Sequence, residues 1–183
     1  DGHPDFTGVY HAPGYGPGDA RGKEGFAHNI ARNLKEDEVP MQPWAKAALK
    51  QRFEVDESRF DPEGFCLPMG TPRVNPYPWK IVQTDKLIVI LYEGNVHGYR
   101  QIFMDGRQHD PNVKETYWGD SIGHWEGDTL VIETVAMQPG SEWLHGFKTG
   151  EAAADMRLVE RMRLSAPNKL EIVNTYYSKI ALT

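Results

Sequence analysis

Short runs of strand-forming residues follow one another from residue 80 to residue 178, and this succession constrains the fold more than any other sequence feature. Pairs or triplets of turn residues, such as Asp105-Gly106, separate the runs. Because short strands joined by hairpin turns build antiparallel sandwiches and barrels, the sequence predicts a mainly β protein. No long helical patterns alternate with the strands, which argues against a doubly wound parallel sheet. The predicted strands are Lys80–Gln83, Leu87–Glu93, His97–Met104, Ser121–Trp125, Thr129–Val135, Met156–Leu164 and Lys169–Ser178.

The first 79 residues have a different character, because Gly and Pro residues concentrate there and in the hairpin turns. Residues 1–42 predict an extended Gly/Pro-rich arm with one short helix over 24–34, where apolar residues recur at helical spacing. Pro43 predicts the start of a second short helix, since a proline is well tolerated at the first helical position. Residues 61–79 predict a rigid, extended, Pro-rich connector. We therefore expect an N-terminal arm over 1–42 and a β-barrel domain over 43–183.

Composition excludes several classes of protein. The chain of 183 residues holds 20 Lys and Arg against 26 Asp and Glu, a formal net charge of −6, which argues against a nucleic-acid-binding protein. No apolar run is long enough for a transmembrane helix. Cys66 is the one cysteine, so no intrachain disulfide forms, and its apolar neighbours predict a buried structural thiol. The first residue is Asp1 rather than Met, which leads us to expect a removed leader and a periplasmic or secreted protein.

The register of the last predicted hairpin follows from its apolar pattern. A three-residue loop over 166–168 would pair Ser165 with Lys169. This register sets Glu160 opposite Asn174 and the neighbouring apolar residues opposite each other, and a slip of one residue would expose an apolar row. Glu160 and Asn174 are therefore predicted to lie side by side on the buried face.

Glu160 is the main candidate for catalysis, with Asn174 and Tyr176 as its partners. The carboxyl group interrupts an apolar row, and burial of this kind raises a carboxyl pKa toward the range that suits general acid or base work. The alternative is a structural role, in which Glu160 bonds to Asn174 or to an arginine across the sheet. Both interpretations stay open at this point. The arginines on the opposite face of the same strand predict a solvated surface with small energetic value.

Histidines give no metal motif, because no pair has the spacing of a known ligand set. His3 is the one weak candidate: if Asp1 is the mature N-terminus, the first three residues offer the square-planar nitrogen set that Cu(II) prefers. No Gly-rich phosphate loop is present, and we expect no cofactor.

Four motifs together resemble a family of exported, largely uncharacterised bacterial proteins. They are Cys66-Leu67-Pro68-x-Gly70-x-Pro72-Arg73, Ile81-Val82-Gln83-Thr84, Met104-Asp105-Gly106-Arg107-x-His109 and Ser121-Ile122-Gly123-x-Trp125-Glu126-Gly127-Asp128-Thr129-Leu130-Val131. The resemblance covers roughly residues 43–180, and it implies export and a lipocalin-like (calycin-type) β-barrel. It implies no activity and no catalytic residues.

Three hypotheses about function follow. In the first, the barrel binds a small, partly apolar or aromatic ligand, because about eight strands enclose room for one small ligand; the expected ligand-binding residues are Trp125, His124, Tyr99, Phe103 and Arg73. In the second, the same barrel is a cofactor-independent lyase, isomerase or hydratase that uses Glu160, an analogy of fold alone. In the third, the protein is an accessory subunit that docks on a larger periplasmic or membrane assembly through residues 1–20.

Overall fold

Eight strands form one continuous sheet, in which every strand lies beside its neighbour in the sequence. The structure is a computed structural model, and it describes residues 2–11, 39–47, 62–68, 70–71, 78–94, 98–138 and 155–183. The seven predicted strands are confirmed, with ends that differ by one or two residues. The strands are β1 (Gly8–Tyr10), β2 (Trp79–Gln83), β3 (Leu87–Tyr92), β4 (Gly98–Phe103), β5 (Asp120–Glu126), β6 (Thr129–Val135), β7 (Arg157–Ala166) and β8 (Lys169–Tyr177).

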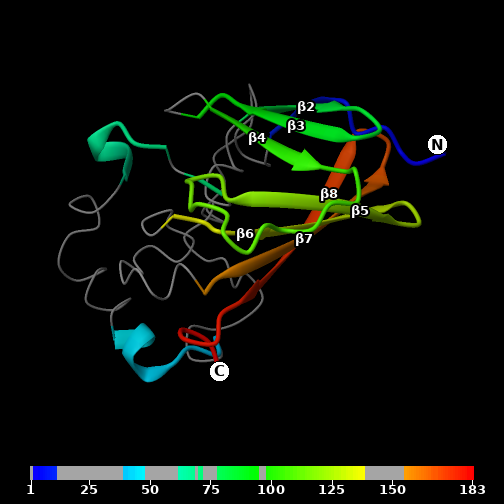
Figure 1. Cartoon of the computed structure of the whole chain (residues 1–183). Coiled ribbons are helices and arrows are strands. Elements are labelled where there is room, and N and C mark those ends of the chain that lie inside the picture. Colours follow the sequence, from blue (N-terminus) through cyan, green and yellow to red (C-terminus); the bar gives the residue numbers. More distant parts are fainter. Residues whose placement is uncertain are drawn as a thin grey trace.

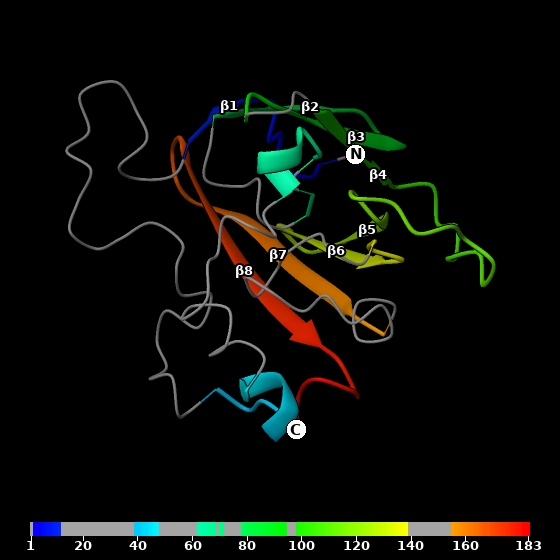
Figure 2. The ribbon, with the colours of Figure 1, turned by 90° about the vertical axis from the view of Figure 1, so that its left-hand side faces the viewer.

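The sheet curls into a half-barrel (Figure 1). Strands β2 to β4 form one wall, and the long strands β7 and β8 cross the other side of the molecule (Figure 2). One pair departs from the predicted antiparallel pattern, because β4 and β5 run parallel and pair only at Ile102↔Ser121 and Phe103↔Ile122. Parallel neighbours need a crossover, and residues 104–119 supply it.

Alternation along the strands divides the sheet into an inner and an outer face. The inner residues form a buried apolar cluster. Its strand members are Trp79, Ile81, Ile88, Ile90, Tyr92, Ile102, Leu130, Ile132 and Met162. Gly123 is an inner position without a side chain, and a Cβ there would lie 2.5 Å from the sulfur of Met104. The absence of a side chain at Gly123 therefore lets Met104 pack closely against the strand.

Residues 2–11 lie on the sheet of the same chain. Gly8–Tyr10 form the edge strand β1, although this segment was predicted as loop, and Phe6 is fully buried in the core. Gln83 fixes the segment, since its side chain accepts a hydrogen bond from the Phe6 amide at 3.0 Å and donates one to the Pro4 carbonyl at 2.9 Å. Residues 12–38 of the predicted arm, with its helix over 24–34, lie outside the described residues.

A short helix over residues 43–47 begins at Pro43, as predicted, and packs beside the C-terminal residues (Figure 2). The indole nitrogen of Trp44 donates to the carbonyl of Ile180 at 3.1 Å, and Met41 forms a β-bridge with Leu182. Together with the ends of β6 and β7, these segments form a second apolar cluster. Its buried members are Ala45, Met137, Met156, Leu158 and Ala181.

The register of β7 and β8 confirms that Glu160 pairs with Asn174. The loop differs from the prediction, because Ala166 rather than Ser165 pairs with Lys169. An irregularity between Leu164 and Ala166 absorbs the extra residue, and Asn168 takes the left-handed conformation with φ 60° that a tight hairpin turn requires.

The Pro-rich segment before β2 departs from the prediction in two respects. Residues Pro62–Phe65 form a 3₁₀ turn rather than an extended connector. Cys66, which follows, is exposed and has a positive φ of 57°, so the prediction of a buried thiol is wrong. The flanking apolar residues Phe65 and Leu67 are exposed as well, which explains the error. In the part of the chain that the structure describes, no helix is long and apolar enough to cross a membrane.

Candidate functional site

A buried ion pair lies at the centre of the inner face. Arg100 occupies the inner row of β4 and Glu160 the inner row of β7, and the guanidinium bonds directly to the carboxylate. The two side chains are 1% and 2% exposed. Glu160 lies between Leu158 and Met162 in the inner row of β7, and there it meets an arginine from across the half-barrel. An arginine across the sheet was one of the two structural partners expected for Glu160.

Two hydroxyl groups complete the surroundings of the guanidinium. Arg100 donates from Nε to Oγ of Ser121 at 2.9 Å and from Nη2 to Oγ1 of Thr134 at 2.6 Å. The two hydroxyl oxygens are 3.0 Å apart. Burial by itself lowers the pKa of Arg100, but Glu160 and other groups outweigh it, so the pKa is raised and the arginine stays charged. A buried charge is tolerated only with partners of this kind.

Two tyrosines lie in the same buried region. Burial raises the pKa of Tyr92 to about 12; Arg100 opposes this change and Glu160 adds to it. Burial also raises the pKa of Tyr176, with a further contribution from Glu160 and an opposing one from Asn174. Both phenols are therefore neutral hydrogen-bonding groups at ordinary pH. The predicted catalytic set of Glu160, Asn174 and Tyr176 does come together, with Glu160 buried and the other two residues partly buried.

A groove of about 490 Å³ lies between β4 and β5. The two parallel strands pair only where β4 ends and β5 begins, and the groove lies beside this short pairing. Outer side chains of β4 form one wall, and the end of the crossover with the start of β5 forms the other. The residues that line the groove are Gly98, Tyr99, Gln101, Phe103, Thr116, Trp118, Gly119, Asp120 and Ser121.

Aromatic side chains dominate this groove. Tyr99 is 58% exposed, and the ring of Phe103 carries the guanidinium of Arg107 at 3.8 Å from its centre. Trp118 lies against Gly98, where a Cβ would be 2.3 Å from the indole, and it stacks on Tyr92 with ring centres 5.1 Å apart. Gly98 thus makes room for the indole, which separates the groove from the interior.

A chain of polar side chains borders the groove and ties the crossover to the sheet. Nδ1 of His109, in the crossover, lies 2.6 Å from Oδ2 of Asp120 in β5, and Nε2 lies 3.6 Å from Oε1 of Glu133 in β6. Arg157 in β7 donates to the second oxygen of Glu133 at 2.6 Å and covers the ring of Tyr177 at 4.0 Å. The chain holds Asp120 in a fixed orientation beside the groove.

The residues predicted to bind a ligand fall into separate places. Tyr99 and Phe103 both line the groove. Trp125 faces the interior, where its ring meets Phe6 at 5.3 Å and stacks on His3 at 4.7 Å between centres. The side chain of His124 is 63% exposed on the other face, beside Glu126. Arg73 lies outside the described residues.

Comparisons with known proteins add no name. Scans against protein-family models, curated proteins and solved structures found no match to this chain. Within the described ranges, no group of three or more His, Cys, Asp or Glu side chains is arranged to hold a metal ion.

Arg100 and Asp120 are important residues that the sequence analysis did not select. Arg100 has a signal in the sequence, since it stands between Gly98 and Ile102 in a strand whose inner positions are otherwise apolar or small. Asp120 has none, because its importance depends on the parallel pairing of β4 and β5, and nothing in the sequence indicates that pairing.

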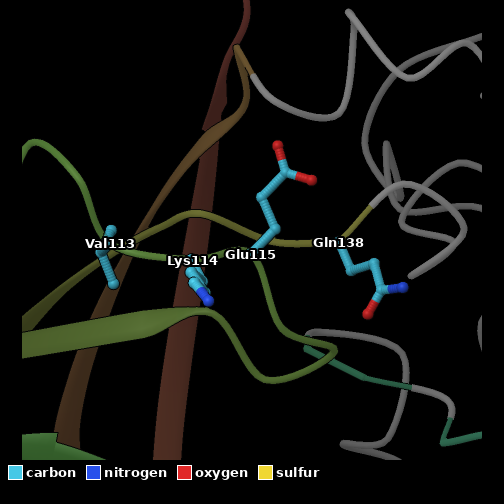
Figure 3. Close-up of a pocket in the computed structure, with 4 residues that line it drawn as sticks. All are labelled: Val113, Lys114, Glu115 and Gln138. Atoms are coloured by element: carbon cyan, nitrogen blue, oxygen red, sulfur yellow. The ribbon is translucent and has the colours of Figure 1, made fainter.

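A second hollow of about 660 Å³ lies where the crossover passes the residues after β6. Its described lining consists of Val113, Lys114, Glu115 and Gln138. The hollow opens widely to solvent, and these side chains project in different directions rather than toward one point (Figure 3). It offers no convergent set of groups, and the groove between β4 and β5 is the stronger candidate.

Proposed function

We propose that this protein binds a small, partly aromatic ligand in the groove between β4 and β5. The carrying observation is the groove itself, which combines a volume of about 490 Å³ with three aromatic side chains and a few polar groups. Small-molecule sites span roughly 300–1,000 Å³ and have this mixture of apolar walls and sparse polar contacts. The polar groups that would orient a ligand are Gln101, Thr116 and Asp120.

The ligand would then lie in the groove beside β4 and not in the interior of the barrel, where the sequence favoured it. Phe6, Met162 and their neighbours pack the interior as an apolar core. Outer side chains of a strand, by contrast, are free to contact a ligand wherever the adjacent strand diverges. The curled sheet supports the further proposal of a lipocalin-like (calycin-type) barrel, and the four sequence motifs support an exported, periplasmic or secreted member of the family they resemble.

The two other hypotheses have less support. Glu160 as a catalytic acid or base requires access to a substrate, whereas its side chain is 2% exposed and bonded to Arg100. The carboxylate accepts a hydrogen bond from the Arg100 guanidinium, which suits a structural acceptor. A docking role for residues 1–20 requires a segment available to a partner, whereas Phe6 and β1 pack on the chain's own sheet.

Binding of 2-phenylethanol, a small neutral aromatic probe, tests the proposal. Saturation-transfer NMR should detect binding to the wild-type protein, and Tyr99→Ala should weaken it about tenfold, as expected for loss of one aromatic wall. Leu91→Ala is the matched control, because Leu91 is an exposed apolar residue opposite Tyr99 in the sheet and does not line the groove. Absence of binding to the wild type, or an equal loss in both variants, would overturn the proposal.

A further inference from the structure

We infer that the groove selects ligands in which a cationic group, an ammonium or an amidinium, is attached to an aromatic ring, with Asp120 as the residue that recognises the cation. The inference rests on the proposed function and deepens it by naming the ligand class. Its first support is the charge of the lining: among the described residues that line the groove, Asp120 alone carries a charge, and that charge is negative.

The second support comes from the aromatic walls. One wall already holds a cation of the chain itself, since the guanidinium of Arg107 lies 3.8 Å from the centre of the Phe103 ring. Tyrosine and tryptophan rings attract cations in the same way, and Tyr99 and Trp118 present two such rings to the groove. A ligand ammonium between Asp120 and these rings would gain from both interactions.

Arg107 feels the charge of Asp120, but its ion-pair partner is Asp105. Its guanidinium is engaged by Asp105, with hydrogen bonds of 2.9 and 3.1 Å from Nε and 2.6 Å from Nη2. This pair is neutral as a whole and stays at the Phe103 end of the groove. The carboxylate of Asp120 therefore remains the strongest acceptor available to a cationic ligand.

His109 is a positioning residue in this scheme. It bonds to Oδ2 of Asp120 at 2.6 Å, and Glu133 and Arg157 continue the chain behind it. Asp120 itself is 18% exposed, so most of its surface is covered and only a restricted part meets a ligand. A carboxylate fixed in this way is pre-organised for an ammonium, because little side-chain freedom is lost on binding.

Three probes with one phenethyl group and different charges test the inference. At pH 7.5 and low salt, calorimetry should give an affinity for 2-phenylethylamine about tenfold above that for 2-phenylethanol, and the weakest affinity for 3-phenylpropionate. Asp120→Asn, which keeps the size of the side chain, should remove the advantage of the amine, so that its affinity falls to that of the alcohol measured with the same variant. A second test uses the wild-type protein alone. Raising the salt from 0.05 to 0.5 M should weaken the binding of the amine and leave the binding of the alcohol unchanged.

The outcomes separate this inference from the proposed function. Equal binding of all three probes, still sensitive to Tyr99→Ala, would overturn the selection of cations and leave the groove as the site. Tighter binding of 3-phenylpropionate would overturn it as well, because Arg107 would then be the dominant charge. Failure of all three probes to bind would overturn the proposed function itself.

Discussion

Each face of the sheet carries an ion pair that involves β7, and the two pairs differ mainly in how exposed their side chains are. On the inner face, Arg100 and Glu160 are 1% and 2% exposed. On the outer face, Arg157 and Glu133 are 41% and 39% exposed, and their contact of 2.6 Å is also close. Glu160 and Arg157 even belong to the same strand, three residues apart. The geometry of contact is therefore similar, while the surrounding medium is not.

This difference decides what each pair contributes. Both inner charges lost their hydration on folding, so each depends on the other and on the hydroxyls of Ser121 and Thr134. The outer charges stay partly hydrated and are screened by salt. The inner pair specifies the packing of the half-barrel, and the outer chain orients a side chain beside the groove at small energetic cost.

Replacement of Glu160 should have the largest effect on stability. Glu160→Gln keeps the shape of the side chain but leaves the buried guanidinium of Arg100 without a counter-charge, which costs about 3–5 kcal/mol in unfolding free energy. Urea unfolding followed by tryptophan fluorescence measures the loss. A loss below about 1 kcal/mol would show that Arg100 finds another partner. The buried pair would then be no more important for stability than the exposed pair.

The double variant of Arg100→Met with Glu160→Leu controls for this effect. Because both charges leave together, the stability should recover to within about 1–2 kcal/mol of the wild type. The Ser121 and Thr134 hydroxyls can still bond to each other, since they are 3.0 Å apart. A double variant no more stable than Glu160→Gln would show that the pair is needed for more than charge balance.

Much of the fold could be predicted from alternation and turn residues. Strands β2 to β8 and the pairing of Glu160 with Asn174 follow from local patterns, because each depends on neighbours in the chain. The 3-residue strand β1 has no such pattern, and the sheet edge beside β2 determines its conformation. The parallel pairing of β4 and β5 depends on the path of a long crossover, which no local pattern encodes.

The candidate site was less predictable for the same reason. The sequence placed Glu160 on the buried face, but Arg100 lies 60 residues away and reaches it only through the curl of the sheet. Tyr99 and Phe103 were selected for their aromatic character, and the structure unites them because they are two outer positions of one strand. Asp120 becomes part of a groove only because the start of β5 pairs with the end of β4.

Tyr92, which is buried on the inner face, should make the stability of the protein depend on pH above pH 10. Its pKa is raised mainly by burial from 10.0 to about 12, so the unfolded chain releases the phenolic proton first. The contribution of Tyr92 to stability is complete below pH 10 and is lost between pH 10 and about 12, by up to about 3 kcal/mol. Tyr92→Phe should flatten this part of the curve of unfolding free energy against pH, while Tyr99→Phe, at an exposed outer position, should not. An unchanged curve in Tyr92→Phe would mean that this phenol does not resist ionisation in the folded protein.

Replacement of Glu133 should have the smallest effect. Glu133→Gln removes the middle charge of the outer chain, where both neighbours keep access to water, and should cost at most about 1 kcal/mol. The cost should shrink further at 0.5 M salt, whereas the cost of Glu160→Gln should not, because salt does not reach a buried pair. The pair of Arg163 and Glu171, also exposed, gives the reference through Glu171→Gln. An equal loss in unfolding free energy for Glu133→Gln and Glu160→Gln would contradict this prediction. The exposure of the side chains would then not determine how much these ion pairs stabilise the protein, and the outer chain would do more than position Asp120.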